Sequence, residues 1–321
     1  MAATNVTREQ ISELYKRIQE LFVSDQVPWV VGYSGGKDST ATLQLVWQAL
    51  AELPPDVRNR KAVHVISTDT LVEQPIVAAW VNQSLELMKK AAESQNMPID
   101  PHRLTPKLDD SYWVNLIGRG YPAPRQTFRW CTSRLKIEPS NHFILEMVKT
   151  HGEAIMVLGT RKAESAHRAA NMERYEKLRT RKWLSPNASL PNSWVFTPIE
   201  NWSNDDVWVY LMQYPNPWGR SNKDLLTMYR GASADNECPL VVDTSTPSCG
   251  NSWFGCWVCT LVNADKSMEA MIQNDEEKLW MAPLLEFRNE LGLLDVNGKL
   301  DDRSRRDFRR MGGGVKLNPR D

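Results

Sequence analysis

The stretch PWVVGYSGGKDS, residues 28–39, determines the fold that this chain is expected to adopt. Its first half is apolar and reads as a buried strand, and its second half opens a run with helical spacing. A strand that turns sharply into a helix leaves backbone N–H groups free at the positive end of the helix dipole, and glycines let an anion approach them. The spacing is not that of a Walker A loop, because Val31 and Asp38 stand where that motif needs Gly and Ser or Thr. The stretch therefore predicts a phosphate-binding loop of another kind.

The sequence on both sides of this loop alternates between strand and helix patterns. Strands are expected over residues 28–33, 62–67, 99–104 and 154–158, and helices over 39–53 and 74–95. This alternation predicts an α/β protein with a doubly wound, mainly parallel sheet, whose ligands bind at the carboxyl ends of the strands.

The segments flanking this unit differ from it. Thr7 and Gln10 fit a capping box that starts an amphipathic helix. Past about residue 200 the pattern becomes mixed helix and loop, and residues 301–310 read as a solvated terminal helix. We therefore expect an N-terminal helix (1–27), a nucleotide-type domain (28–200) and a cysteine-rich C-terminal region (201–321).

Polar residues follow two further strands. Asp69 ends the second one, where a carboxylate commonly binds a ribose hydroxyl, although a helix N-cap explains it equally well. Arg161 and Arg168 follow the fourth strand, where they could face one phosphate group or form surface ion pairs.

Cys131 lies in a basic run, residues 125–136, that contains no acidic residue. Nearby cations are expected to lower the pKa of its thiol and favour a nucleophilic thiolate that could carry sulfur as a persulfide. A buried, inert cysteine is the competing interpretation.

The other four cysteines fall within 22 residues, with ten, six and two residues between them: Cys238, Cys249, Cys256 and Cys259. A C-x-x-C pair with two further cysteines is typical of a four-thiolate site for Zn²⁺ or an iron–sulfur cluster, and the spacing does not choose between them.

The bulk composition limits the function classes. The 39 basic and 39 acidic residues balance, so a uniformly basic surface for gripping nucleic acid is excluded. Neither a signal peptide nor a membrane-length apolar stretch is found, so a cytoplasmic protein without membrane contact is expected.

Several motifs together resemble the phosphoadenosine phosphosulfate reductase family of PP-loop ATP pyrophosphatases, over about residues 28–212. They are the loop 34–39, Arg129-Trp130-Cys131-Thr132 with Lys136, Gly159-x-Arg161-x-x-Glu164-Ser165, and Pro198-x-x-x-Trp202-x-x-x-Asp206-Val207-Trp208. Within that family, the segments 238–251 and 255–260 closely resemble the DndC-type sulfurtransferases of bacterial DNA phosphorothioation, with the SspD type a close alternative. The chain lacks the cysteine-containing tail of phosphoadenosine phosphosulfate reductases, so sulfate reduction is the weaker interpretation.

The resemblance implies a reaction and a set of residues. ATP and Mg²⁺ would bind at Ser34, Gly35, Gly36, Lys37, Asp38 and Ser39, with Asp69, Arg161 and Arg168 nearby; Lys37, Asp38 and Cys131 would be catalytic. The four clustered cysteines would hold a [4Fe-4S] cluster. A DNA phosphate oxygen would be adenylated with release of pyrophosphate. Sulfur from a persulfide on Cys131, or from a labile sulfide of the cluster, would then displace AMP.

The same resemblance implies partners. A cysteine desulfurase would supply sulfur, and companion DndD/DndE-like or SspB/SspC-like subunits would supply most of the DNA affinity. The alternatives are transfer-RNA thiolation, sulfonucleotide reduction and a non-catalytic nucleotide-binding subunit of a DNA defence complex.

Overall fold

The computed structural model describes residues 6–124, 128–232, 255–292, 308–311 and 314–317. Its centre is a six-stranded sheet with the order β3-β2-β1-β4-β6-β5. The strands β1 (Trp29–Gly32), β2 (Val63–Thr68), β3 (Ile99–Leu104), β4 (Ala154–Val157) and β6 (Ser193–Phe196) are parallel, and the short β5 (Ser185–Pro186) pairs antiparallel with β6. The α/β fold predicted from the sequence is confirmed, with strand boundaries shifted by a residue or two.

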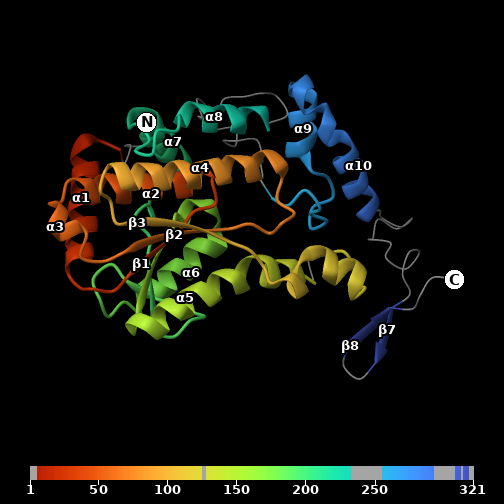
Figure 1. Ribbon diagram of the computed structural model, residues 1–321, viewed down its shortest axis with the longest axis horizontal. Coiled ribbons are helices and arrows are strands. Elements are labelled where there is room, and N and C mark those ends of the chain that lie inside the picture. The colour runs from red at the N-terminus through yellow and green to blue at the C-terminus, as the bar shows by residue number, and fades with distance from the viewer. Residues whose placement is uncertain (1–5, 125–127, 233–254, 293–307, 312–313, 318–321) are drawn as a thin grey trace.

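Helices cover both faces of this sheet (Figure 1). One layer contains α2 (Lys37–Ala51), α4 (Pro75–Ser94), α7 (Asn204–Gln213) and α8 (Asn222–Gly231), and the opposite layer contains α5 (Glu138–His151) and α6 (Ala166–Glu176). The short α3 (Pro55–Arg58) follows α2, because Pro54 and Pro55 end that helix. The chain leaves β1 toward β2 and β3 on one side and later adds β4 and β6 on the other, which creates a switch point between β1 and β4.

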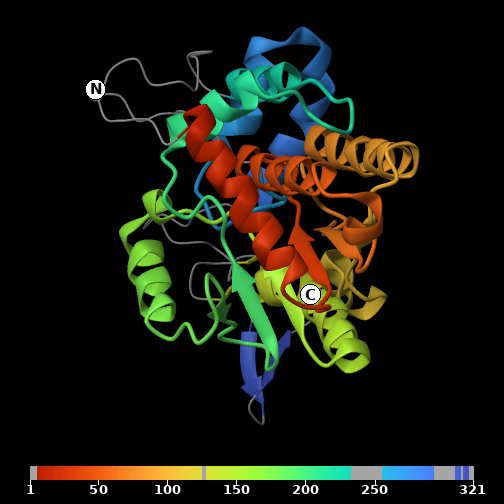
Figure 2. The same ribbon diagram turned by 90° about the vertical axis from the view of Figure 1, so that its left-hand side faces the viewer.

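The N-terminal helix α1 (Arg8–Val23) begins at the predicted capping box, in which the Thr7 side chain accepts from the Gln10 N–H. It packs on α2 (Figure 2). All six apolar residues of its predicted stripe are buried: Ile11, Leu14, Tyr15, Ile18, Leu21 and Phe22.

The main hydrophobic core crosses both expected domain boundaries. It runs from α1 through the sheet to Trp202, Trp208 and Tyr229, beyond residue 200. The packing therefore unites α1, the sheet and the α7–α8 pair, and the sequence change near residue 200 marks no break in the core.

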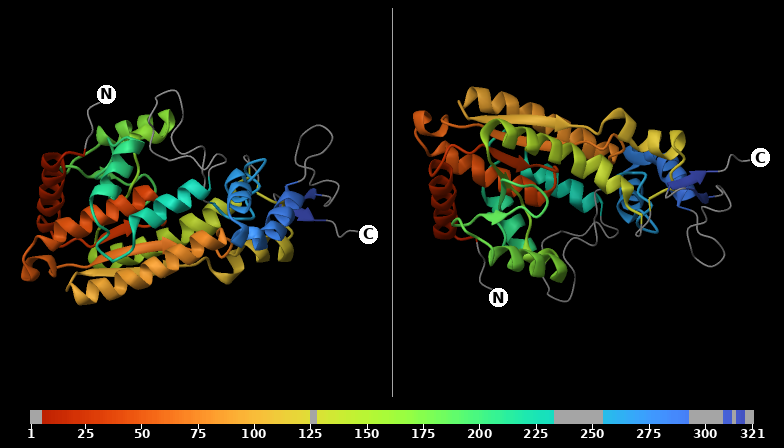
Figure 3. Two further views of the ribbon diagram at one scale, coloured as in Figure 1. Left: turned by 90° about the horizontal axis from the view of Figure 1, so that it is seen from above. Right: turned by 90° about the horizontal axis from the view of Figure 1, so that it is seen from below.

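A second assembly of helices lies at the end of the molecule opposite α1 (Figure 3). It contains α9 (Lys266–Asn274) and α10 (Ala282–Leu291), joined by a 3₁₀ segment, Glu276–Met281. Strands β7 (Phe308–Met311) and β8 (Gly314–Leu317) form an antiparallel hairpin. The terminal helix expected over residues 301–310 is therefore wrong for 308–310, which are β-strand.

None of the helices in the described parts of the chain has the length and apolarity that crossing a bilayer requires.

Candidate functional site

The predicted phosphate loop joins β1 to α2 at the switch point. Gly36 is the N-cap of α2 and provides no side-chain cap. The Lys37 N–H donates to the Tyr229 hydroxyl at 3.3 Å, which leaves the Asp38 and Ser39 N–H groups of the first turn for an anion. Gly35 has a φ of +75°, and a Cβ there would lie 2.5 Å from Val81 Cγ2. The Ser39 hydroxyl accepts from the Ser34 N–H at 3.2 Å and donates to the Gly36 carbonyl at 3.0 Å, which fixes the loop's curvature.

The two charged residues of the loop form a network with Arg161. Asp38 lies between two cations, with Lys37 Nζ 2.9 Å from Oδ2 and Arg161 Nε 2.6 Å from Oδ1. Arg161, only 4% exposed, also donates from Nη1 to the Trp202 carbonyl at 3.2 Å. Asp38 thus links the first turn of α2 to the segment that follows β4, and Gly159 permits this approach because a Cβ there would lie 2.7 Å from the Asp38 carbonyl oxygen.

Arg161 and Arg168 each pair with a carboxylate. Arg168 forms an ion pair with Glu164, whose other oxygen accepts from the Arg161 N–H at 2.9 Å. Arg168 lines the cavity above the loop, whereas Arg161 is buried beside it. Both arginines therefore form ion pairs, as one of the two sequence interpretations expected. Of the two, Arg168 lines the cavity.

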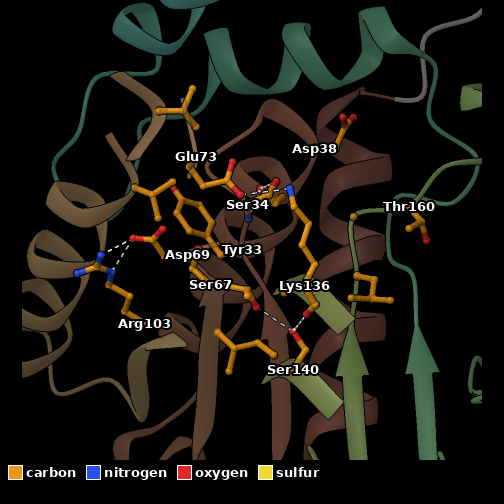
Figure 4. A pocket seen from close by; sticks show the side chains of 18 of the residues that line it. Tyr33, Ser34, Asp38, Ser67, Asp69, Glu73, Arg103, Lys136, Ser140 and Thr160 are labelled. Carbon is orange, nitrogen blue, oxygen red and sulfur yellow. Dashed lines mark hydrogen bonds and ion pairs between the residues drawn. The ribbon is translucent and has the colours of Figure 1, made fainter. Parts of the chain in front are cut away.

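A cavity of about 490 Å³ lies over the carboxyl ends of β1, β2 and β4 (Figure 4). Its volume is in the usual range for a small-molecule site. The lining residues come from the loop and from the ends of three strands; they include Ser34, Asp38, Ser39, Ser67, Thr68, Asp69, Gly159 and Thr160.

Asp69 lines this cavity and does not cap a helix. Its Oδ1 accepts from the Leu71 N–H at 2.7 Å, and its other oxygen forms an ion pair with Arg103. The N-cap of α4 is Gln74, whose side chain accepts from the Val77 N–H at 3.0 Å. The N-cap alternative is therefore wrong, and a carboxylate is available at the cavity wall.

Two residues that the sequence did not single out as a pair, Glu73 and Lys136, connect the cavity to a cysteine. Their side chains meet at the cavity, with Nζ 3.2 Å from Oε1 (Figure 4). The same Oε1 accepts from the Thr70 hydroxyl at 3.1 Å, and that hydroxyl is 3.3 Å from Cys256 Sγ. Burial lowers the pKa of Lys136, but the nearby Cys256 and Glu73 raise it by more. The net effect is a raised pKa, and the Lys136 side chain stays protonated.

Cys256 and Cys259 lie in a turn held against the start of α4. The Cys259 N–H donates to the Cys256 carbonyl at 3.0 Å, and Trp257 N–H donates to the Val72 carbonyl at 3.0 Å. Burial, with a contribution from Glu73, raises the pKa of Cys256 to about 12. The other two predicted ligands, Cys238 and Cys249, lie outside the described residues.

Cys131 packs in the same small core as Cys256, beside Trp130 and Val258. Burial raises the pKa of its thiol, and proximity to Cys259 adds to that rise. The predicted lowering of its pKa by the basic run is wrong, because the effect of burial dominates; within the run, Arg134 pairs with Asp110 at 2.6 Å and Lys136 pairs with Glu73. Cys131 is nevertheless brought next to the C-x-x-C turn, which begins 125 positions further along the chain.

A glycine-cradled helix N-terminus at a sheet switch point, with a cavity above it, is an arrangement typical of nucleotide-binding α/β proteins. The chain belongs to the phosphoadenosine phosphosulfate reductase domain family, which matches residues 28–217.

Individual relatives are distant. An uncharacterised protein of Methanocaldococcus jannaschii is 26% identical over 210 residues, which are 65% of this chain and 35% of that protein. The chain thus spans about a third of the curated relative that it matches.

Solved structures of other proteins are also similar to the chain. The phosphoadenylyl-sulfate reductase of Candida auris in its phosphate complex is 16% identical, with a TM-score of 0.39 over 68% of this chain and 91% of that one. The U34-tRNA thiolase NcsA of Methanococcus maripaludis with its [4Fe-4S] cluster is 13% identical, with a TM-score of 0.37 over 88% and 78% of the chains. Similarities of this size say nothing about activity.

Proposed function

We propose that this protein uses ATP to activate a DNA backbone phosphate and then transfers sulfur to it. The observation that carries the proposal is the direct connection of the nucleotide cavity to the cysteine turn through Glu73, Lys136 and Thr70. A group activated in the cavity would be separated from the Cys256 thiol by the Glu73 carboxylate and the Thr70 hydroxyl. The DNA substrate itself rests on the resemblance of the cysteine segments.

The loop residues suit the binding of ATP. The uncapped N-terminus of α2 and the glycines at 35, 36 and 159 would hold the triphosphate, and Asp69 would bind the ribose. Asp38 already lies between two cations, so Mg²⁺ would enter on the phosphates rather than on that carboxylate.

In the first step, a non-bridging oxygen of a DNA phosphate attacks the α-phosphorus of ATP, and the bond to the β-phosphate oxygen breaks. Pyrophosphate leaves, and the DNA phosphate becomes adenylated. Lys37 and the helix N-terminus stabilise the charge that develops on the leaving group. Arg161 holds Asp38, and through it Lys37, in the required position.

In the second step, a sulfur nucleophile attacks the activated DNA phosphorus and expels AMP. With a persulfide on Cys131, the terminal sulfur forms the S–P bond, and a second thiol then cleaves the S–S bond. This leaves sulfur on phosphorus and a disulfide between the two thiols, which an external reductant reopens. A cysteine desulfurase supplies the persulfide sulfur: the Cys131 thiolate attacks the outer sulfur of the donor's persulfide, and the donor's cysteine leaves as a thiolate.

The cysteine turn suits a metal–sulfur centre. Cys256 and Cys259 are free thiols on one turn, and a cluster bound there would supply iron as a Lewis acid for sulfur. Anaerobically purified protein should be brown and contain about four irons per chain, whereas one zinc ion and no colour would contradict an iron–sulfur centre.

The zero net charge implies that companion subunits provide most of the DNA affinity. Tight, site-specific DNA binding by the isolated chain would contradict this part of the proposal.

Adenylation is tested with ATP labelled at the α-phosphate, mixed with DNA and companion subunits but without a sulfur donor. We expect label on DNA together with released pyrophosphate, and neither with Lys37→Ala. Binding of ATP without release of pyrophosphate would instead indicate a non-catalytic nucleotide-binding subunit.

A further inference from the structure

Three potential metal ligands lie together on the sheet face that α5 covers. His64 is on β2, and Asp100 and His102 are on the neighbouring β3. The parallel register pairs His64 with Asp100, and residues two apart on a strand project to the same face, so all three side chains share it. None of them lines the nucleotide cavity.

The three ligand atoms converge on one point. His102 Nε2 is 3.0 Å from His64 Nδ1 and 3.0 Å from Asp100 Oδ2, and His64 Nδ1 is 3.7 Å from the same carboxylate oxygen. A triangle with these edges has a circumradius of about 1.9 Å, so an ion just above its plane would lie about 2.0–2.1 Å from all three atoms, the bond length of Zn²⁺ to imidazole and carboxylate.

The surroundings hold this arrangement in place and leave it accessible. Phe143 of α5 packs on both imidazoles, with ring centroids 5.6 Å from His64 and 4.9 Å from His102. The Asp100 side chain is 58% exposed, which gives an ion a route from solvent and leaves a further coordination position for water. Ligands on two paired strands require little rearrangement on binding.

We propose that His64, Asp100 and His102 bind a divalent transition-metal ion, with two nitrogen ligands and one carboxylate oxygen. This donor set suits Zn²⁺ and the late first-row metals rather than Mg²⁺ or Ca²⁺. The ion would tie β3 to β2. It would thereby steady Arg103, which follows His102 directly and pairs with Asp69 at the cavity wall.

The test is a zinc titration of the full chain whose cysteines carry the iron–sulfur centre, followed by competition with a chromophoric chelator and by metal counting. The wild-type chain should bind one equivalent of Zn²⁺ more than His102→Gln, and zinc should raise the melting temperature of the wild type but not of that variant. Asp100→Asn changes an exposed side chain, so it should fold normally and bind this zinc at least tenfold more weakly.

His142→Gln is the matched control, because His142 is an exposed histidine of α5 that pairs with Glu146 of the same helix at 3.4 Å. It should bind zinc like the wild type. The proposal is overturned if wild type, His102→Gln and Asp100→Asn bind the same number of zinc ions with the same affinity. It is also overturned if the extra equivalent disappears in Cys256→Ser but persists in His102→Gln.

Discussion

The ion pair between Asp38 and Arg161 allows a quantitative test of how the loop is held. Asp38→Ala leaves the guanidinium of Arg161, a residue only 4% exposed, with the Trp202 carbonyl as its one remaining partner among the contacts described above. Breaking a buried ion pair from one side costs about 3–5 kcal/mol. The Asp38 side chain is 24% exposed, so water screens part of its interaction with Arg161. We therefore expect Asp38→Ala to lower the free energy of unfolding by about 3 kcal/mol.

Urea denaturation at neutral pH measures this loss, and the pyrophosphate assay measures its effect on the first step. Glu20→Ala is the matched control, because Glu20 pairs with Lys182 where both side chains are more than 60% exposed, and it should cost less than about 0.5 kcal/mol. Asp38→Asn retains an acceptor for Arg161 and should lose about half as much stability as Asp38→Ala.

A double-mutant cycle completes the test. Arg161→Met removes the buried charge, so Asp38→Ala made in that background should cost at least about 1.5 kcal/mol less than in the wild type. Additive losses, or a cost for Asp38→Ala equal to that of Glu20→Ala, would refute the view that Asp38 compensates a buried arginine.

Three further predictions concern the loop, the connection to the cysteines and a buried lysine. Gly35→Ala should destabilise the protein by about 2 kcal/mol in thermal unfolding and abolish ATP binding. The reason is that residue 35 has a left-handed conformation and the new Cβ would lie 2.5 Å from Val81. Normal ATP affinity of this variant would contradict the loop assignment. Glu73→Gln removes the charge between Lys136 and Cys256. It should leave pyrophosphate release within about twofold of wild type but lower sulfur incorporation by about tenfold or more. Equal losses in both assays would show that Glu73 serves only the cavity. Burial lowers the pKa of Lys61 despite its ion pair with Asp25, so the folded state releases this proton before the unfolded state does. The stability of the wild type relative to Lys61→Met should therefore rise as the pH increases through the lowered folded pKa toward 10.5, and a fall over this range in paired denaturation curves would contradict the assignment.

The fold was predictable because its signals are local. The apolar run at 28–33, the glycines of the loop and the proline pair at 54 and 55 each act within a few residues of themselves. These signals place the loop at the carboxyl end of a strand, which is where the structure has it.

The contacts within the site were not predictable, because the residues that form them are distant in sequence. Asp38 and Arg161 are 123 positions apart, and Thr70 and Cys256 are 186 apart. Cys131 illustrates the resulting error: the basic run suggested an acidified thiol, yet burial raises the pKa of that thiol, and Arg134 and Lys136 pair with Asp110 and Glu73, which lie outside the run.

The most direct test of the proposed function is whether sulfur reaches a DNA phosphate. The protein, a cysteine desulfurase with cysteine, companion subunits, a reductant, ATP, DNA and transfer RNA are combined anaerobically. Both nucleic acids are then digested with nucleases and analysed by mass spectrometry. We predict phosphorothioate dinucleotides that require ATP and vanish with Lys37→Ala. Sulfur found only on transfer-RNA bases, or DNA that remains free of phosphorothioate while pyrophosphate is released, would contradict the proposed function.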